Sequence, residues 1–292
     1  MHIGRALVNL ADALAATDPA AAADAARTAA GHLRRAGARS ALTFAITNLV
    51  QALLMVGDWD AADRELLQAV DSDGLAVIEH IGCYRGWLAA LRGDVGTAEA
   101  MLAGLRDVRG NEDAQTKAEI SLAEAFIAAA HRQPDEALRH AQNVVALRDA
   151  LGISHECIRW AWPLAARAAH ELGDIATTGE LLALLDSYQP GYLAPVLQAE
   201  RGLSRARLAD RDDGQSAGAA FASAIVSLRQ QSTPYHLAHG LLDHAEHLLG
   251  RGDAEGAAAA IEEARGIGTG LHCEPLLIRA DAIEHSKPRI PA

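Results

Sequence analysis

The 292-residue sequence has few aromatic residues and few cysteines, and each shortage argues against a class of protein. Aromatic residues make up 4% of a chain that is 50% hydrophobic, so Ala and Leu must supply the core, which favours helix over sheet. The three cysteines, Cys83, Cys157 and Cys273, are widely spaced and form no CxxC pair. This spacing gives no support to a disulfide framework or to a cysteine-rich zinc site.

Basic residues are also in deficit. The chain carries 26 Lys and Arg against 38 Asp and Glu, a formal net charge of -12. An acidic surface repels phosphate backbones and anionic lipids, so we expect neither nucleic acid nor membrane as a partner of this region. The sequence shows no charged-then-apolar leader and no apolar run of the roughly 18 residues that a membrane helix needs, and we expect a cytoplasmic location.

What the chain does contain is an internal repeat. A Gly-Asp pair interrupts an apolar helical pattern in "VGDW", "RGDV", "LGDI" and "RGDA". A small residue stands five positions after each turn glycine or its equivalent, and a small or apolar residue follows seven positions later on the same helix face. Successive units are 36 to 41 residues apart, and their small residues are Ala22, Ala62, Ala98, Ala137, Thr178, Ala217 and Ala257.

The residues of the turn have a physical role. Gly57, Gly93, Gly173 and Gly252 can adopt the left-handed conformation that ends a helix. The aspartate after each of them can cap the free N–H groups of the next helix. Each unit is therefore predicted to be a helix, a tight turn and a second helix.

These hairpins predict an all-α solenoid of about seven helical hairpins plus a final capping helix, as one array over 1–285. A hinge is possible near 188–195, and the tail 286–292 is expected to be disordered. The first helices are expected at about 2–16, 40–56, 76–92, 114–132, 155–172, 194–209 and 234–250. The second helices are expected at about 19–36, 59–70, 95–106, 135–150, 175–186, 215–230 and 254–266, with the final helix near 274–285. Pro163 either kinks a continuous fifth first helix or begins a shorter one, and the apolar stripe through it favours the kink.

The Gly-Asp turn, followed by Ala five and twelve residues later, resembles the tetratricopeptide repeat, although the period exceeds that family's usual length of about 34 residues. The segments "GISHECIRWAWPLAARAAHELGD" (152–174) and "STPYHLAHGLLDHAEHLLGRGDAEGAAAAIEEAR" (232–265) are similar to the C-terminal repeat arrays of large bacterial signalling proteins. Those proteins join such an array to an ATPase module, often with a class III nucleotide-cyclase or LuxR-type DNA-binding domain. The resemblance implies a tetratricopeptide-like fold and a regulatory role.

The catalytic chemistry of those proteins is not expected here. The chain has no GxxxxGK[ST] phosphate loop, no recognisable cyclase carboxylate pair and no basic recognition helix. We therefore expect no catalytic residues, no cofactor and no enzymatic activity. The chain begins inside its first expected helix without a polar cap, so we expect a piece of a longer signalling protein or a stand-alone relative of one.

The best candidate site is a concave groove. In tetratricopeptide-like arrays the first helix of each hairpin lines the inner surface, and its inward positions can be counted back from the turn. These positions combine aromatic rings with amide, imidazole and guanidinium groups, which suits a peptide, a protein segment or a small organic effector. The predicted groove comprises Phe44, Asn48, Gln51, His80, Tyr84, Trp87, Phe126, Trp160, Arg167 and His170, with Cys83 and Glu119 beside them. A real groove requires Tyr84, Trp87, Phe126 and Arg167 to be partly exposed; otherwise these aromatics fill core between hairpins.

A second candidate is a stripe of polar residues on one helix face, comprising His236, His239, Asp243 and His247. Adjacent pairs could supply two ligands to zinc, with His272 or Cys273 as a third donor. The alternative is a solvated polar face of Asp–His pairs. One helix alone does not complete a metal site, so we predict no bound metal.

Three functions stay open at this stage. The preferred one is a non-catalytic scaffold or sensor that binds a peptide, protein or small ligand in the groove and regulates an attached domain. The second is self-association through Ala-rich surfaces or the first helix, and the sequence leaves the oligomeric state undetermined. The third is a metal-dependent hydrolase that uses the His236–His247 helix.

Overall fold

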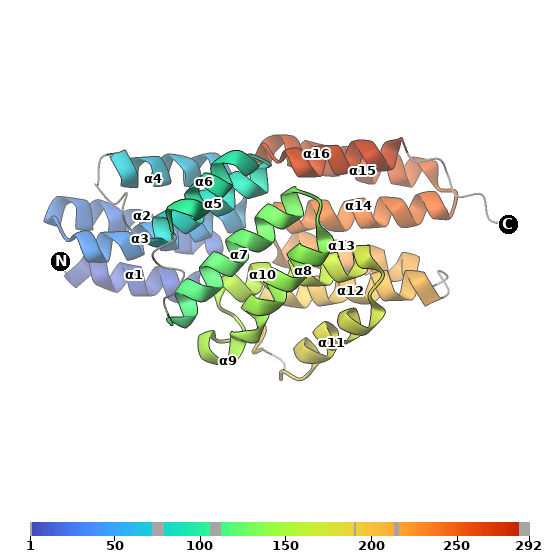
Figure 1. Ribbon diagram of the computed structural model, residues 1–292, viewed down its shortest axis with the longest axis horizontal. Coiled ribbons are helices and arrows are strands. Elements are labelled where there is room, and N and C mark those ends of the chain that lie inside the picture. Colours follow the sequence, from blue (N-terminus) through green and yellow to red (C-terminus); the bar gives the residue numbers. More distant parts are fainter. Residues whose placement is uncertain (1, 72–78, 106–111, 190, 213–215, 286–292) are drawn as a thin grey trace. The chain divides into compact units, whose positions relative to one another are not determined.

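The computed structural model describes residues 2–71, 79–105, 112–189, 191–212 and 216–285. Within these ranges the protein is all-α, with 16 helices that pack in consecutive pairs as a repeat-like helical array (Figure 1). The chain divides into two compact units, Met1–Ala161 and Trp162–Ala292. The predicted disordered tail, 286–292, lies outside the described residues.

The first unit is built from hairpins in which each helix packs against the next. Its helices are α1 (His2–Leu14), α2 (Pro19–Ala36), α3 (Arg39–Val56), α4 (Trp59–Asp71), α5 (Glu79–Arg92), α6 (Val95–Gly104), α7 (Ala114–Ala130), α8 (Pro134–Ala146) and the short α9 (Arg148–Leu151). The first helices also contact one another in sequence, α1 with α3, α3 with α5 and α5 with α7. This stacking brings one face of each first helix to the same side of the unit.

The second unit repeats this arrangement. Helix α10 (Glu156–Leu172) contains the division between the units, and the helices after it are α11 (Ile175–Asp186), α12 (Pro195–Asp212), α13 (Ala217–Gln231), α14 (Pro234–Gly250), α15 (Ala254–Leu271) and α16 (Glu274–Glu284). Helix α12 pairs with α13 and α14 with α15, while α12, α14 and α16 contact in sequence. The indole of Trp162 ties α10 to α11, because its Nε1 donates to the carbonyl of Leu181 at 3.0 Å.

The expected helices agree with the observed ones to within a few residues at most ends. Pro163 lies inside the continuous helix α10, so it does not begin a shorter helix, as the apolar stripe through it predicted. Two differences matter. Helix α9 was not predicted. Helix α15 runs through Gly266–Gly270, beyond its expected end, and the missing side chain of Gly268 lets Leu276 and Leu277 of α16 approach closely. The possible hinge at 188–195 falls within the second unit and stays a prediction.

The turns form as their residue types predict. Gly57, Gly93, Gly173 and Gly252 have φ angles of 87°, 90°, 73° and 82°, in the left-handed region that a side chain would strain. The aspartates after them accept hydrogen bonds from backbone N–H groups three residues on, at 3.0, 3.1, 3.0 and 2.9 Å. The Gly-Asp pair therefore ends one helix and begins the next in a single step.

The repeated small residues are the points where helices meet. Ala22, Ala62, Ala98, Ala137, Thr178, Ala217 and Ala257 are all between 0% and 2% exposed. The residues seven positions later, Ala29, Ala69, Leu105, Val144, Leu185, Ala224 and Ala264, are buried as well. The seven-residue spacing in the sequence thus correctly predicts the buried face of the second helix in each hairpin.

Helix α3 is the one helix in the described part of the chain that is long and apolar enough to cross a membrane. Inside the first unit it contacts α1, α2, α4 and α5, and 61% of its residues are buried. A helix surrounded in this way is apolar because it belongs to a protein core.

Candidate ligand-binding site

A pocket of about 730 Å³ opens in the first unit, on the side where the first helices lie. One face of each of α1, α3, α5 and α7 lines it, together with the start of α10. Five residues of the predicted groove are in the lining, namely Phe44, Asn48, Gln51, His80 and Tyr84. The inward positions counted back from the turns are therefore half right, because five of the ten predicted residues share one pocket lining and the other five do not.

Three side-chain hydrogen bonds form the inner end of the pocket. The Gln51 Nε2 donates to the Tyr84 hydroxyl at 2.5 Å, which joins α3 to α5. The His80 Nδ1 bonds Glu119 Oε2 at 2.6 Å, which joins α5 to α7, and Gln115 Nε2 donates to Glu119 Oε1 at 2.9 Å. These contacts hold Glu119, whose side chain is 1% exposed, as an anchored carboxylate in the pocket.

The Tyr84 hydroxyl is neutral throughout the physiological range. Burial raises the pKa of Tyr84 well above its usual value, and the charges of Glu156 and Glu119 raise it further. Both carboxylates line the same pocket as the phenol. The pocket thus presents a hydroxyl and two carboxylates in one lining.

The outer part of the pocket is more exposed and partly apolar. The Phe44 side chain is 57% exposed, and Val8 and Ala41 lie in the same lining. The Asn48 Nδ2 donates to the carbonyl of Val8 at 3.1 Å and so fixes α1 against α3. An exposed aromatic ring beside fixed polar groups is typical of ligand sites.

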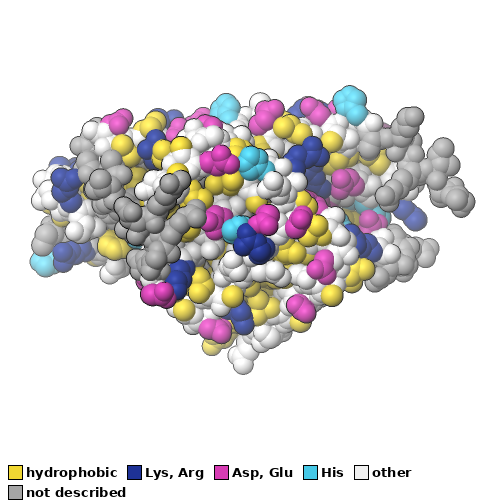
Figure 2. Space-filling model, viewed as in Figure 1, with side chains coloured by type: hydrophobic (Ala, Val, Ile, Leu, Met, Phe, Trp, Pro, Cys, Tyr) yellow, Lys and Arg dark blue, Asp and Glu magenta, His cyan; other side chains and the backbone are white. Residues whose placement is uncertain are grey.

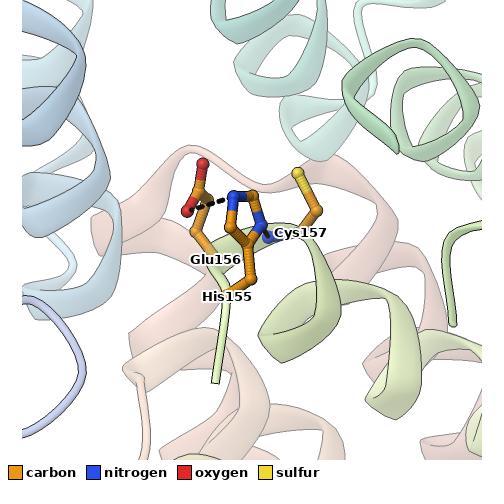
Figure 3. Close-up of side chains that lie close together, drawn as sticks. All are labelled: His155, Glu156 and Cys157. Carbon is orange, nitrogen blue, oxygen red and sulfur yellow. Dashed lines mark hydrogen bonds and ion pairs between the residues drawn. The ribbon is translucent and has the colours of Figure 1, made fainter. Parts of the chain in front are cut away.

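His155, Glu156 and Cys157 stand together at the start of α10, with donor atoms within 4.8 Å of one another (Figure 3). These donor types suit zinc. The His155 Nδ1, however, accepts the backbone N–H of Cys157 at 3.3 Å, so the ring proton is on Nε2, which pairs with Glu156 Oε2 at 3.3 Å. Burial, and then the charges of Glu156 and Glu119, raises the pKa of the Cys157 thiol well above its usual value. An imidazole with both nitrogens engaged beside a neutral thiol orients Glu156 and is poorly arranged for a metal.

Three predicted groove residues lie behind the pocket and not in its lining. Trp87, Phe126 and Trp160 are 1%, 3% and 3% exposed, and continue from Tyr84 as a row of edge-to-face contacts with ring centroids 4.6, 6.1 and 5.9 Å apart. The Trp87 Nε1 donates to the carbonyl of Glu119 at 3.0 Å. The expected partial exposure of Tyr84, Trp87 and Phe126 is therefore wrong. These large rings fill the space between neighbouring first helices, so this part of the predicted groove is core between hairpins.

Arg167 and His170 lie in the second unit, where both belong to a charged core. The Arg167 Nη2 donates to the Tyr235 hydroxyl at 3.3 Å, and its guanidinium lies 5.7 Å from the ring centroid. Arg167 is 7% exposed, so its expected exposure in a groove is also wrong. Burial and the charge of Arg207 lower the pKa of His170 to about 4, and burial raises the pKa of Glu200 to about 7.

The histidine stripe on α14 belongs to the same core. His236, His239, Asp243 and His247 are between 2% and 8% exposed, which contradicts a solvated polar face. The Asp243 carboxylate is ion-paired with Arg207 through Oδ2 at 2.5 Å and with Arg279 through Oδ1 at 2.6 Å. Burial lowers the pKa of His236 to about 3 and that of His239 well below its usual value. A carboxylate already bonded to two guanidinium groups favours a structural ion-pair network over a metal site.

A second hollow of about 550 Å³ lies between α6, α7 and α8 and is more open. Its His140 and His131 pair with Glu124 and Glu99, both at 3.0 Å. On the face shown in Figure 2, acidic, basic and apolar side chains of the described residues are interspersed, without a broad basic area. That distribution agrees with the net acidic composition.

Several residues of the pocket lining were not predicted from the sequence. Arg5, Val8, Asn9 and Asp12 follow i, i+3, i+4 and i+7 on α1, and this helical face could have identified them. His155 and Glu156 stand where α10 begins, and no periodicity singles them out.

No protein-family model matches the chain, and no curated protein is significantly similar to it.

Proposed function

We propose that this chain is a non-catalytic scaffold or sensor module that binds a small organic molecule or a short peptide in the pocket of its first unit. The observation that carries the proposal is the pocket itself, lined by one face of each of α1, α3, α5 and α7 and by the start of α10. Its volume of about 730 Å³ lies in the range of small-molecule sites. Fixed polar groups at the inner end and Phe44 at the outer end are the combination that orients a ligand.

We further propose that the array is tetratricopeptide-like and serves as a regulatory region of a bacterial signalling protein with an ATPase, cyclase or transcription domain. The 36- to 41-residue period, the left-handed turn glycines and the buried small residues support the repeat. A ligand in the pocket touches several first helices at once, so binding favours one arrangement of these helices over others. That preference is the signal an attached domain would receive.

The proposal is tested by native mass spectrometry of the purified chain, together with melting curves against a small-molecule and peptide library. We expect a ligand of a few hundred daltons whose binding weakens about tenfold or more in Phe44→Ala, because an exposed aromatic anchor is lost. Val56→Ala is the matched control, since Val56 is an exposed apolar residue of α3 outside the pocket lining. A chain with no retained ligand and no melting shift that depends on Phe44 would show the proposal to be wrong.

Self-association is the second candidate, and two exposed residues of α1 favour it. Ile3 and Leu10 are 64% and 48% exposed and stand one heptad apart on the same face. The same spectra report the oligomeric state. A dimer that Leu10→Ser dissociates, without a retained ligand, would favour this candidate over the sensor.

A further inference from the structure

The pocket of the first unit carries an excess of negative charge. Its lining contains the carboxylates of Asp12, Glu119 and Glu156 against the guanidinium of Arg5. The buried guanidinium of Arg159, outside the lining, interacts with Glu156 and Asp12 and offsets part of this charge, so three carboxylates stand against two guanidinium groups. The side chains of Glu119 and Glu156 are 1% and 12% exposed, so water screens their charges weakly. The pocket therefore attracts cations and repels phosphates and carboxylates.

Acceptor atoms converge at the inner end. Each Glu119 oxygen accepts one hydrogen bond and has a lone pair left. The Glu156 Oε2 pairs with His155, while its Oε1 has no hydrogen bond within the described part of the chain. Both carboxylates line the same pocket as the Tyr84 hydroxyl, whose pKa their charges raise. Three acceptor groups in one pocket lining match the three N–H donors of a primary ammonium ion.

The outer end supplies a surface for a hydrocarbon chain. Phe44 is 57% exposed, and Val8 and Ala41 lie in the same lining. Covering the ring removes apolar surface from water, and the face of the ring also attracts a cation. The lining is thus acidic and buried at the inner end of the pocket, and apolar and exposed at the outer end.

We propose that the ligand is an alkylammonium compound, with its ammonium group on Glu156, Glu119 and the Tyr84 oxygen and its alkyl chain against Phe44. This inference rests on the proposed ligand-binding function and specifies its chemistry. Two sources share that chemistry, a small diamine and the lysine side chain of a peptide. Both ring nitrogens of His155 are engaged, Nδ1 by the backbone N–H of Cys157 and Nε2 by Glu156, which favours an organic cation over a metal ion at this carboxylate.

The test is isothermal titration calorimetry of the full chain with the diamine cadaverine. Pentanediol and glutarate are neutral and anionic controls of the same chain length, and a lysine-containing peptide is tested in parallel. We expect cadaverine or the peptide to bind and both control compounds to fail. Which of the two cations binds more tightly identifies the source of the ammonium group. In Glu156→Gln we expect binding to weaken about tenfold or more, the usual effect of removing one charged hydrogen-bond partner.

The matched variant is Glu124→Gln, the same substitution on α7 in the same unit but in the other hollow. It should bind like the wild type, and melting curves confirm that both variants are folded. The inference would be overturned if pentanediol or glutarate bound as tightly as the amines, or if the two variants bound the amines equally well. It would also be overturned if the chain bound zinc and not amines, and Glu156→Gln removed the zinc binding. A Phe44-dependent ligand that is not an amine overturns the inference alone, whereas the absence of any Phe44-dependent ligand overturns the proposed function as well.

Discussion

Asp243 shows at the scale of one residue how a charged side chain is accommodated in the second unit. It is 4% exposed and is ion-paired with Arg207 and Arg279. Burial raises the pKa of Asp243, but the two guanidinium charges outweigh burial and hold it at about 2. Because this value lies below the ordinary 3.8, the ionised carboxylate stabilises the fold above about pH 4, and that stability is lost as the pH falls towards 2.

The substitution Asp243→Asn should therefore lower the free energy of unfolding by about 3 kcal/mol or more near neutral pH, because two buried guanidinium groups lose their counter-ion. Urea denaturation measures the effect. The control is Glu246→Gln on the same helix, which pairs with Arg279 from a side chain that is 50% exposed and should cost about 1 kcal/mol or less. Similar losses for the two variants would contradict the account of a buried network.

At the scale of the element, the Gly-Asp turn specifies each hairpin locally. The glycine supplies the left-handed residue, and the aspartate caps the helix that follows. The glycine conformation and the aspartate cap each involve only residues a few positions apart in the sequence. The turn therefore forms wherever the pair occurs and does not depend on which hairpin packs beside it.

Asp253→Ala tests this local role in α15, where Asp253 Oδ1 accepts the N–H of Gly256 at 2.9 Å. We expect a loss of about 1 kcal/mol in the free energy of unfolding, the usual effect of removing an N-cap, measured by urea denaturation. Glu255→Ala, at an exposed position of the first turn of α15, serves as the comparison and should change stability by about 0.5 kcal/mol at most. An unchanged stability in Asp253→Ala would mean that packing alone sets the start of the helix.

At the scale of the whole molecule, composition governs long-range electrostatics. The 38 acidic residues exceed the 26 basic ones, and the described residues show no broad basic area on the face in Figure 2. A protein must neutralise phosphates with cations to bind nucleic acid tightly.

The full chain should therefore not bind a short DNA duplex at physiological salt, as measured by fluorescence anisotropy. Lowering the salt concentration should not produce binding either, because the net charge is repulsive and screening only weakens the repulsion. Salt-sensitive binding of the duplex would show that a local basic site outweighs the net charge.

The helical hairpins could be predicted from the sequence because they depend on short-range geometry. A small residue and its partner seven positions later share one face of a helix, and the structure buries both in every unit. Counting back from each turn likewise predicted that Phe44, Asn48, Gln51, His80 and Tyr84 face inward, and all five line the pocket, because a helix turns by a constant angle per residue. The pocket-lining face of α1 follows the same rule.

Only the tertiary structure decided how deep each inward side chain lies. Periodicity gives the direction of a side chain from its helix axis, but the volumes of the neighbouring helices determine whether that side chain reaches a pocket. Trp87, Phe126 and Trp160 point inward and are buried behind the pocket, whereas Phe44 stays exposed. The pairing of Asp243 with Arg207 and Arg279 joins residues about one repeat apart, so its charged core follows from packing between hairpins and not from local sequence.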